Sequence, residues 1–109
     1  MIKNISVTKL KKKYESNEEF ILLDVRTDSE VVKAQIPIDS IHIPMNEIPQ
    51  KISQLNNNDK LIVYCKSGVR SKKVCEYLAI NNFKNISNLE GGIVAWANEF
   101  DIIMLNKLF

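Results

Sequence analysis

The sequence predicts an α/β fold in which a mainly parallel sheet carries helices on both faces. Two continuous apolar runs, residues 20–25 and 61–64, have the length of buried strands and lack the alternation of a strand with one wet face. Helical patterns, with apolar residues three or four positions apart, cover about residues 6–14 and 71–80. Strands that alternate with helices at this spacing favour parallel pairing through crossover helices.

The remaining elements are shorter. They are, in chain order, a capped helix over 27–34, a strand at 40–43, a helix over 45–55, a strand at 85–89 and a helix over 93–100. Thr27 and Glu30 have the spacing of a capping box at the start of the first of these. Pro49 falls inside the 45–55 helix, which a helix tolerates only when the proline occupies its first turn. His42 is predicted to be a strand residue whose ring has its hydrogen-bond partners.

Length and composition predict one domain over residues 1–109 with an ordinary globular character. The chain has 109 residues, 45% apolar and 26% charged, and a formal charge of +2 that does not favour nucleic acid or a membrane as partner. The start of the chain lacks the apolar core of a secretory signal, and no apolar run approaches the roughly 18 residues that span a bilayer. A cytoplasmic, reducing location is therefore expected. With 2 cysteines, 1 histidine and no CxxC pair, no metal site is expected.

Cys65 stands at the end of the second apolar run, before a short basic loop and a helix. The loop residues are Lys66, Ser67, Gly68, Val69, Arg70 and Ser71. A thiol at the N-terminus of a helix and beside two cations loses its proton readily. Gly68 permits the loop to curl so that its N–H groups converge on the sulfur. The hydroxyls of Ser67 and Ser71 are further hydrogen-bond donors, and the planar guanidinium of Arg70 suits an oxyanion. A nucleophilic cysteine is favoured over a buried strand-end cysteine with solvated charges.

Four motifs in this order resemble the rhodanese-like sulfurtransferase domain. They are residues 22–26 with Glu30, residues 41–44, residues 63–71, and residues 89–93 with Ala95 and Trp96. The chain departs from the family's pattern over residues 34–40, where an altered turn is expected, and at His42, where the family often has asparagine.

The resemblance implies a five-stranded, mainly parallel sheet and a reaction through a persulfide on Cys65, without any other cofactor. Thiosulfate, or a persulfide on a relay protein, would donate sulfur, and Lys66 and Arg70 would attract an anionic donor. An Arg26–Glu30 pair would fix the turn after the first strand, and Asp24 would support it. Gly91 and Gly92 are expected to belong to the scaffold of the loop. A second resemblance, to rhodanese domains fused to adenylating enzymes of sulfur-carrier pathways, makes a relay between proteins plausible.

Two other functions fit the motif less well. A phosphatase or arsenate reductase of related fold has five residues between cysteine and arginine, whereas four separate Cys65 from Arg70. A non-catalytic interaction module would not need the intact cysteine loop. The apolar tail, residues 102–109, is expected to pack on the domain, with a dimer or partner contact as the alternative. A monomer or weak dimer is therefore expected.

Overall fold

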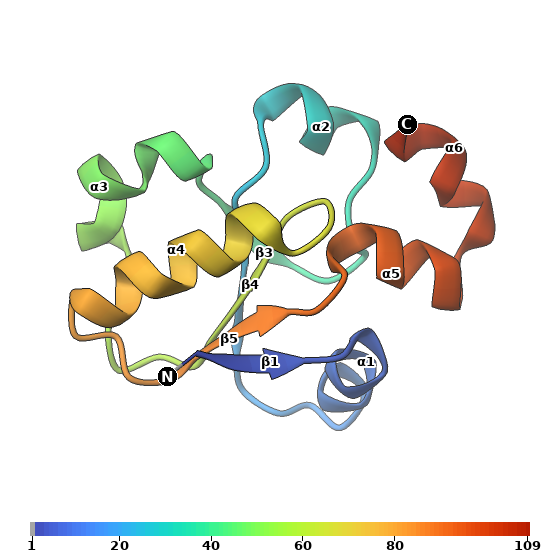
Figure 1. Cartoon of the computed structure of the whole chain (residues 1–109). Helices are drawn as coiled ribbons and strands as arrows, with labels where there is room; N and C mark the ends of the chain where they lie inside the picture. The colour runs from blue at the N-terminus through green and yellow to red at the C-terminus, as the bar shows by residue number, and fades with distance from the viewer. Residues whose placement is uncertain (1) are drawn as a thin grey trace.

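The computed structural model describes residues 2–109 and contains one five-stranded sheet (Figure 1). The strands are β1 (Lys3–Ile5), β2 (Ile21–Asp24), β3 (Ser40–His42), β4 (Leu61–Tyr64) and β5 (Ile86–Leu89). Their order is β1-β5-β4-β2-β3, and every neighbouring pair is parallel. The predicted α/β fold with a mainly parallel sheet is confirmed. All carboxyl ends of the strands therefore lie along one edge, where open α/β sheets place their ligands.

Residues 2–109 also form six α-helices and three 3₁₀ turns, of which α5, η3 and α6 follow the last strand and the others lie between strands. The α-helices are α1 (Val7–Glu15), α2 (Asp28–Lys33), α3 (Ile48–Lys51), α4 (Val69–Ile80), α5 (Gly92–Phe100) and α6 (Leu105–Leu108). The 3₁₀ turns are η1 (Met45–Glu47), η2 (Ile52–Gln54) and η3 (Ile102–Met104). No helix in this part of the chain combines the length and the apolar character that crossing a bilayer requires.

A separate hydrophobic core covers each face of the sheet. Leu23 and Val63 pack with Val74 of α4 on one face, whereas the preceding residues of the same strands, Leu22 and Ile62, belong to the core on the other face. Successive side chains of a strand point to opposite faces, so a strand that is covered on both sides is apolar throughout. This explains the continuous apolar runs of the sequence. Cys65 lies on the face of α4.

The strand β1 was not among the elements predicted from residue patterns. It has three residues, of which only Ile5 is buried, and it pairs with β5 at the edge of the sheet. Neither its length nor its composition distinguishes it from a loop. Its pairing with β5 depends on contacts between residues far apart in the sequence.

Two predicted helices are shorter than expected. The single helix over 45–55 is wrong, because this segment forms η1, α3 and η2 in succession. Pro49 occupies the first turn of α3, which is the one position where the predicted helix could have held it. Ala34 is extended and ends α2 at Lys33 instead of continuing it. The predicted cap of α2 is confirmed, since Thr27 and Glu30 form a capping box.

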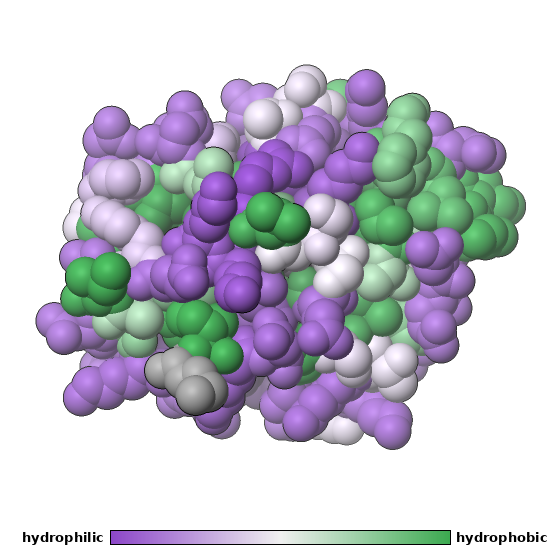
Figure 2. Space-filling model, viewed as in Figure 1, coloured by the Kyte–Doolittle hydropathy of each residue, from purple (hydrophilic) through white to green (hydrophobic). Residues whose placement is uncertain are grey.

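The apolar tail packs partly against the domain. Met104 and Leu108 are half-buried against the core that contains Trp96. Ile102, Ile103 and Phe109 remain exposed, and Figure 2 shows apolar atoms gathered at the right, over η3 and α6. The prediction that the tail packs on the domain is therefore confirmed for Met104 and Leu108, but not for the three exposed side chains.

Candidate active site

The loop after β4 holds the Cys65 sulfur against backbone N–H groups. The Gly68 N–H donates to Sγ at 3.1 Å and the Ser71 N–H at 3.3 Å, while the Ser71 hydroxyl lies 3.3 Å from the sulfur. Gly68 has a φ of 98°, in the region that favours glycine, and α4 begins directly after it. The Cys65 side chain is 1% exposed. The predicted convergence of loop N–H groups on the thiol is confirmed.

Hydrogen bonds make the Cys65 thiol more acidic than an ordinary cysteine. Burial raises the pKa of Cys65, but the hydrogen bonds that the sulfur makes with Ser71 and with the N–H groups of Gly68 and Ser67 outweigh this effect, so the pKa is lowered. Cys75 shows the contrast, because it is fully buried in the same core and burial raises its pKa to about 12. Of the two thiols, Cys65 is therefore the more acidic, which is the property that a cysteine nucleophile needs.

Asn88 of β5 holds the cysteine loop through two hydrogen bonds, and it was not among the site residues predicted from the sequence. Its Oδ1 accepts a hydrogen bond from the Ser71 hydroxyl at 2.5 Å, and its Nδ2 donates to the Gly68 carbonyl at 3.2 Å. Asn88 is buried and makes these two bonds on the same face of the sheet as Cys65. The available signal was an asparagine one residue before the carboxyl end of a covered strand, where a buried amide needs partners.

The first turn of α5 holds the outer side of the loop. The N–H groups of Ile93 and Val94 donate to the carbonyls of Cys65 and Lys66, at 3.0 and 3.1 Å. The loop carbonyls thus bond to α5, while loop N–H groups bond to the sulfur. Gly92 makes this contact possible, because a Cβ there would stand 2.5 Å from both carbonyl oxygens. This contact agrees with the expectation that the two glycines belong to the loop's scaffold.

The predicted Arg26–Glu30 pair is wrong. Arg26 instead pairs with Asp24, with its Nη2 2.8 Å from Oδ2, and both side chains are 1% exposed. It also donates to the carbonyl of Ala34 at 2.9 Å, which ties the end of α2 to the sheet. Residues 24 and 26 are two positions apart in extended chain and so point to the same face. Removing one partner of such a buried pair typically destabilises a protein by about 3–5 kcal/mol.

Glu30 instead binds Arg70 of the cysteine loop. Two parallel bonds join the guanidinium to the carboxylate, at 2.7 and 2.9 Å. Arg70 lowers the pKa of Glu30 to about 2, against the opposing effect of burial. The fork that was expected to receive an anionic donor is therefore occupied by Glu30 in this structure. The pair joins α2 to the first turn of α4 and holds both beside the thiol.

The other predicted site residues lie at the surface of the loop. Lys66 is half-buried, with its Nζ 4.0 Å from the centre of the Phe109 ring. Ser67 and Val69 are exposed, and within residues 2–109 the Ser67 hydroxyl makes no hydrogen bond to the sulfur. His42 is a strand residue as predicted, at the end of β3, and one of its ring nitrogens has a partner: Nε2 lies 2.7 Å from the Arg26 carbonyl oxygen.

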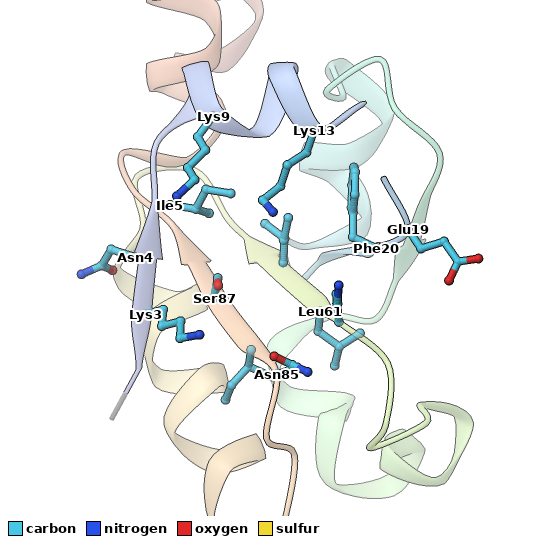
Figure 3. A pocket seen from close by; sticks show the side chains of 13 residues that line it. Lys3, Asn4, Ile5, Lys9, Lys13, Glu19, Phe20, Leu61, Asn85 and Ser87 are labelled. Atoms are coloured by element: carbon cyan, nitrogen blue, oxygen red, sulfur yellow. The ribbon is translucent and has the colours of Figure 1, made fainter. Parts of the chain in front are cut away.

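A separate hollow of about 290 Å³ lies by the amino ends of the strands, away from the cysteine loop. Figure 3 shows Lys9 and Lys13 of α1 extending into it from above and Lys3 of β1 from the side. Lys13 pairs with Glu18 at 3.3 Å. No cysteine lines this hollow, so it is separate from the site around Cys65.

Replacement of Ser71 by alanine should raise the pKa of the Cys65 thiol. The Ser71 hydroxyl, which bonds Asn88, lies 3.3 Å from the sulfur and can turn its proton to the thiolate, and this stabilisation is lost while burial remains. A higher thiol pKa leaves less thiolate at neutral pH, so alkylation by iodoacetamide at pH 7 should slow by roughly threefold to tenfold. The measurement is the alkylation rate from pH 5 to 10, whose midpoint should move upward. Ser67→Ala is the matched control, and an equal shift in both variants would contradict the role of Ser71.

The fold and the loop define a class of protein: an α/β domain that presents one acidified cysteine in a cradle of N–H groups at the carboxyl edge of a parallel sheet. Comparison with known families narrows this class. The sequence profile of the family described as "Rhodanese-like domain" matches residues 6–99. The chain therefore belongs to the rhodanese-like domain family.

Individual relatives agree with this assignment. The Bacillus subtilis protein YtwF, which carries a provisional name as a sulfurtransferase, is 45% identical over 98 residues, or 90% of this chain and 93% of that one. YrkF of the same organism, provisionally named a sulfur carrier protein, is 35% identical over 90% of this chain and 52% of its own length. A crystal structure of a rhodanese-like domain protein from Staphylococcus aureus superposes with a TM-score of 0.81 at 39% identity, over 87% of this chain and 91% of that one. The chain is thus similar to proteins named for sulfur transfer.

Proposed function

We propose that this protein is a sulfurtransferase that carries sulfane sulfur as a persulfide on Cys65. The observation that carries the proposal is the convergence of the Gly68 and Ser71 N–H groups on a buried sulfur. These donors stabilise a thiolate, and the anionic outer sulfur of a persulfide needs the same kind of stabilisation. Membership of the rhodanese-like family supports the assignment.

The transfer has two steps that balance without a further oxidant or reductant. The Cys65 thiolate attacks the sulfane sulfur of thiosulfate, a new S–S bond forms on Cys65, and sulfite leaves with the electrons of the broken bond. A thiolate or cyanide acceptor then attacks the outer sulfur, and the Cys65 thiolate leaves. A persulfide on a partner protein would donate in the same way, with the partner's thiolate as leaving group.

The four-residue spacing between Cys65 and Arg70 favours sulfur over phosphate as the group that the loop holds. Here Arg70 is also bound by Glu30, which leaves its fork unavailable to a tetrahedral oxyanion. Hydrolysis of phosphate esters would need this arginine to bind the transferred group. The phosphatase alternative is therefore the weaker one.

A role in a sulfur relay between proteins is part of the proposal. Its support is the similarity to YrkF, whose provisional name describes a sulfur carrier. A reducing location such as the cytoplasm would suit the chemistry, because both cysteines are free thiols in the fold and Cys65 must stay reduced to act.

Mass spectrometry of the protein after incubation with thiosulfate tests this function. The peptide that contains Cys65 should gain the mass of one sulfur atom and lose it again on addition of cyanide or a thiol. The peptide that contains Cys75 should gain none. Absence of the adduct from thiosulfate and from a small persulfide, together with release of phosphate from aryl phosphates, would overturn the proposal.

A further inference from the structure

A second hollow, of about 280 Å³, lies beside the cysteine loop between α2 and α6. Its lining residues are Arg26, Glu30, Lys33, Lys66, Lys107 and Leu108. Lys66 directly follows Cys65, so the hollow adjoins the loop that holds the thiol.

The hollow has an excess of positive charge. Two of its ionised residues are neutralised, because Arg26 pairs with Asp24 and Glu30 pairs with Arg70. Lys33 of α2, Lys66 of the loop and Lys107 of α6 have no carboxylate within ion-pair distance among residues 2–109. Three lysines from separate segments thus line this space, and Glu30, the acid among its lining residues, is already paired with Arg70.

The tail brings Lys107 to this position. Leu108, its neighbour, packs half-buried against the core, and the Lys66 ammonium lies against the ring of Phe109, which joins loop and tail. Figure 1 shows α6 beside α2, at the end of the chain. The family profile matches residues 6–99, so α6 lies outside the matched region. Lys107 and Leu108, which line one side of the hollow, therefore belong to a segment that the family profile does not cover.

We propose that this hollow binds the oxyanion group of a small sulfur donor, the sulfonate of thiosulfate or the sulfite it releases, with Lys33 and Lys107 as binding residues. The inference rests on the proposed function. Attack on thiosulfate brings a thiolate next to a dianion, so the step needs nearby cations. Because Glu30 neutralises Arg70, the loop supplies only Lys66, and the two additional lysines come from α2 and α6.

The test compares two donors on three variants of the full chain. In Lys107→Gln and in Lys33→Gln, the second-order rate of persulfide formation from limiting thiosulfate should fall roughly fivefold, the effect of one exposed ion pair of about 1 kcal/mol. Cysteine persulfide has no sulfonate, so its rate should fall much less. Lys84→Gln, at an exposed lysine before β5, is the matched control for net charge and should leave the ratio of the two rates unchanged.

The outcomes separate this inference from the proposed function. An unchanged donor ratio in Lys107→Gln and Lys33→Gln, or an equal change in Lys84→Gln, would overturn the inference while leaving sulfur transfer intact. If neither donor labels Cys65, the proposed function fails. Sulfite binding to Cys65→Ser protein, measured by calorimetry, then still tests the hollow: binding that Lys107→Glu abolishes supports it, and binding that is absent or insensitive to Lys107→Glu overturns it.

Discussion

Replacement of Cys65 by serine should abolish sulfur transfer while the protein remains folded. The serine hydroxyl is similar in size to the thiol and can accept the same N–H groups, so the loop has no reason to rearrange. An alcohol does not ionise near neutral pH, and an oxygen at this position cannot form a persulfide. The measurement is thiocyanate formation from thiosulfate and cyanide, which should fall to the rate without protein.

Cys75→Ser is the matched control for this prediction. Cys75 is buried in the same core and its pKa is raised to about 12, so it contributes no thiolate to the reaction. A hydroxyl in this apolar core lowers stability by roughly 1–3 kcal/mol if it finds no partner, so the assay is run well below the unfolding temperature. Activity that survives in Cys65→Ser and disappears in Cys75→Ser would contradict the assignment of the nucleophile.

Replacement of Gly92 by alanine should damage both the fold and the loop. A Cβ at this position would stand 2.5 Å from the carbonyl oxygens of Cys65 and Lys66, which are backbone atoms that cannot turn aside. Residue 92 also has a φ of 59°, which a residue with a side chain adopts at a cost. The two effects together should lower the free energy of unfolding by about 2–4 kcal/mol. Urea denaturation measures this loss.

The alkylation rate of Cys65 shows whether the same substitution disturbs the loop. Moving the two carbonyls moves the N–H groups on the other side of the loop, so the thiol of Gly92→Ala should react more slowly per folded molecule. Gly91→Ala is the comparison, because its φ of 77° is also left-handed but its Cβ would meet the Ala95 side chain instead of the cysteine loop. Stability and thiol reactivity like those of the unaltered protein in Gly92→Ala would contradict this account.

The cysteine loop was predictable because its structure is local. Strand, cysteine, glycine and helix follow one another within residues 61–80, and Gly68 sits at the one loop position with a positive φ. The partner of Arg70 was not predictable in this way, because Glu30 lies 40 positions earlier and reaches it only through the packing of α2. The residues around Arg70 would be the same whether its guanidinium were free or paired, so the local sequence does not distinguish the two.

The Arg26 pairing and the helix over 45–55 failed for different reasons. Residues 26 and 30 have helical spacing, but Arg26 precedes the cap of α2, so the strand period that pairs it with Asp24 applies. For the helix predicted over 45–55, the apolar positions were correctly predicted to face the core, since Ile48 and Leu55 are buried. Successive 3₁₀ and α turns can present the same face as one helix, and periodicity alone does not separate them.

The bonds from α5 to the loop also fix the order in which the site can assemble during synthesis. The donors that hold the Cys65 and Lys66 carbonyls are residues 93 and 94, and Asn88 comes only shortly before them in the chain. A nascent chain that has released Cys65 but not these residues lacks the bonds that shape the loop. Its thiol is then an ordinary one, mostly protonated at neutral pH. The set of bonds around Cys65 is therefore complete only after the first turn of α5 has been synthesised.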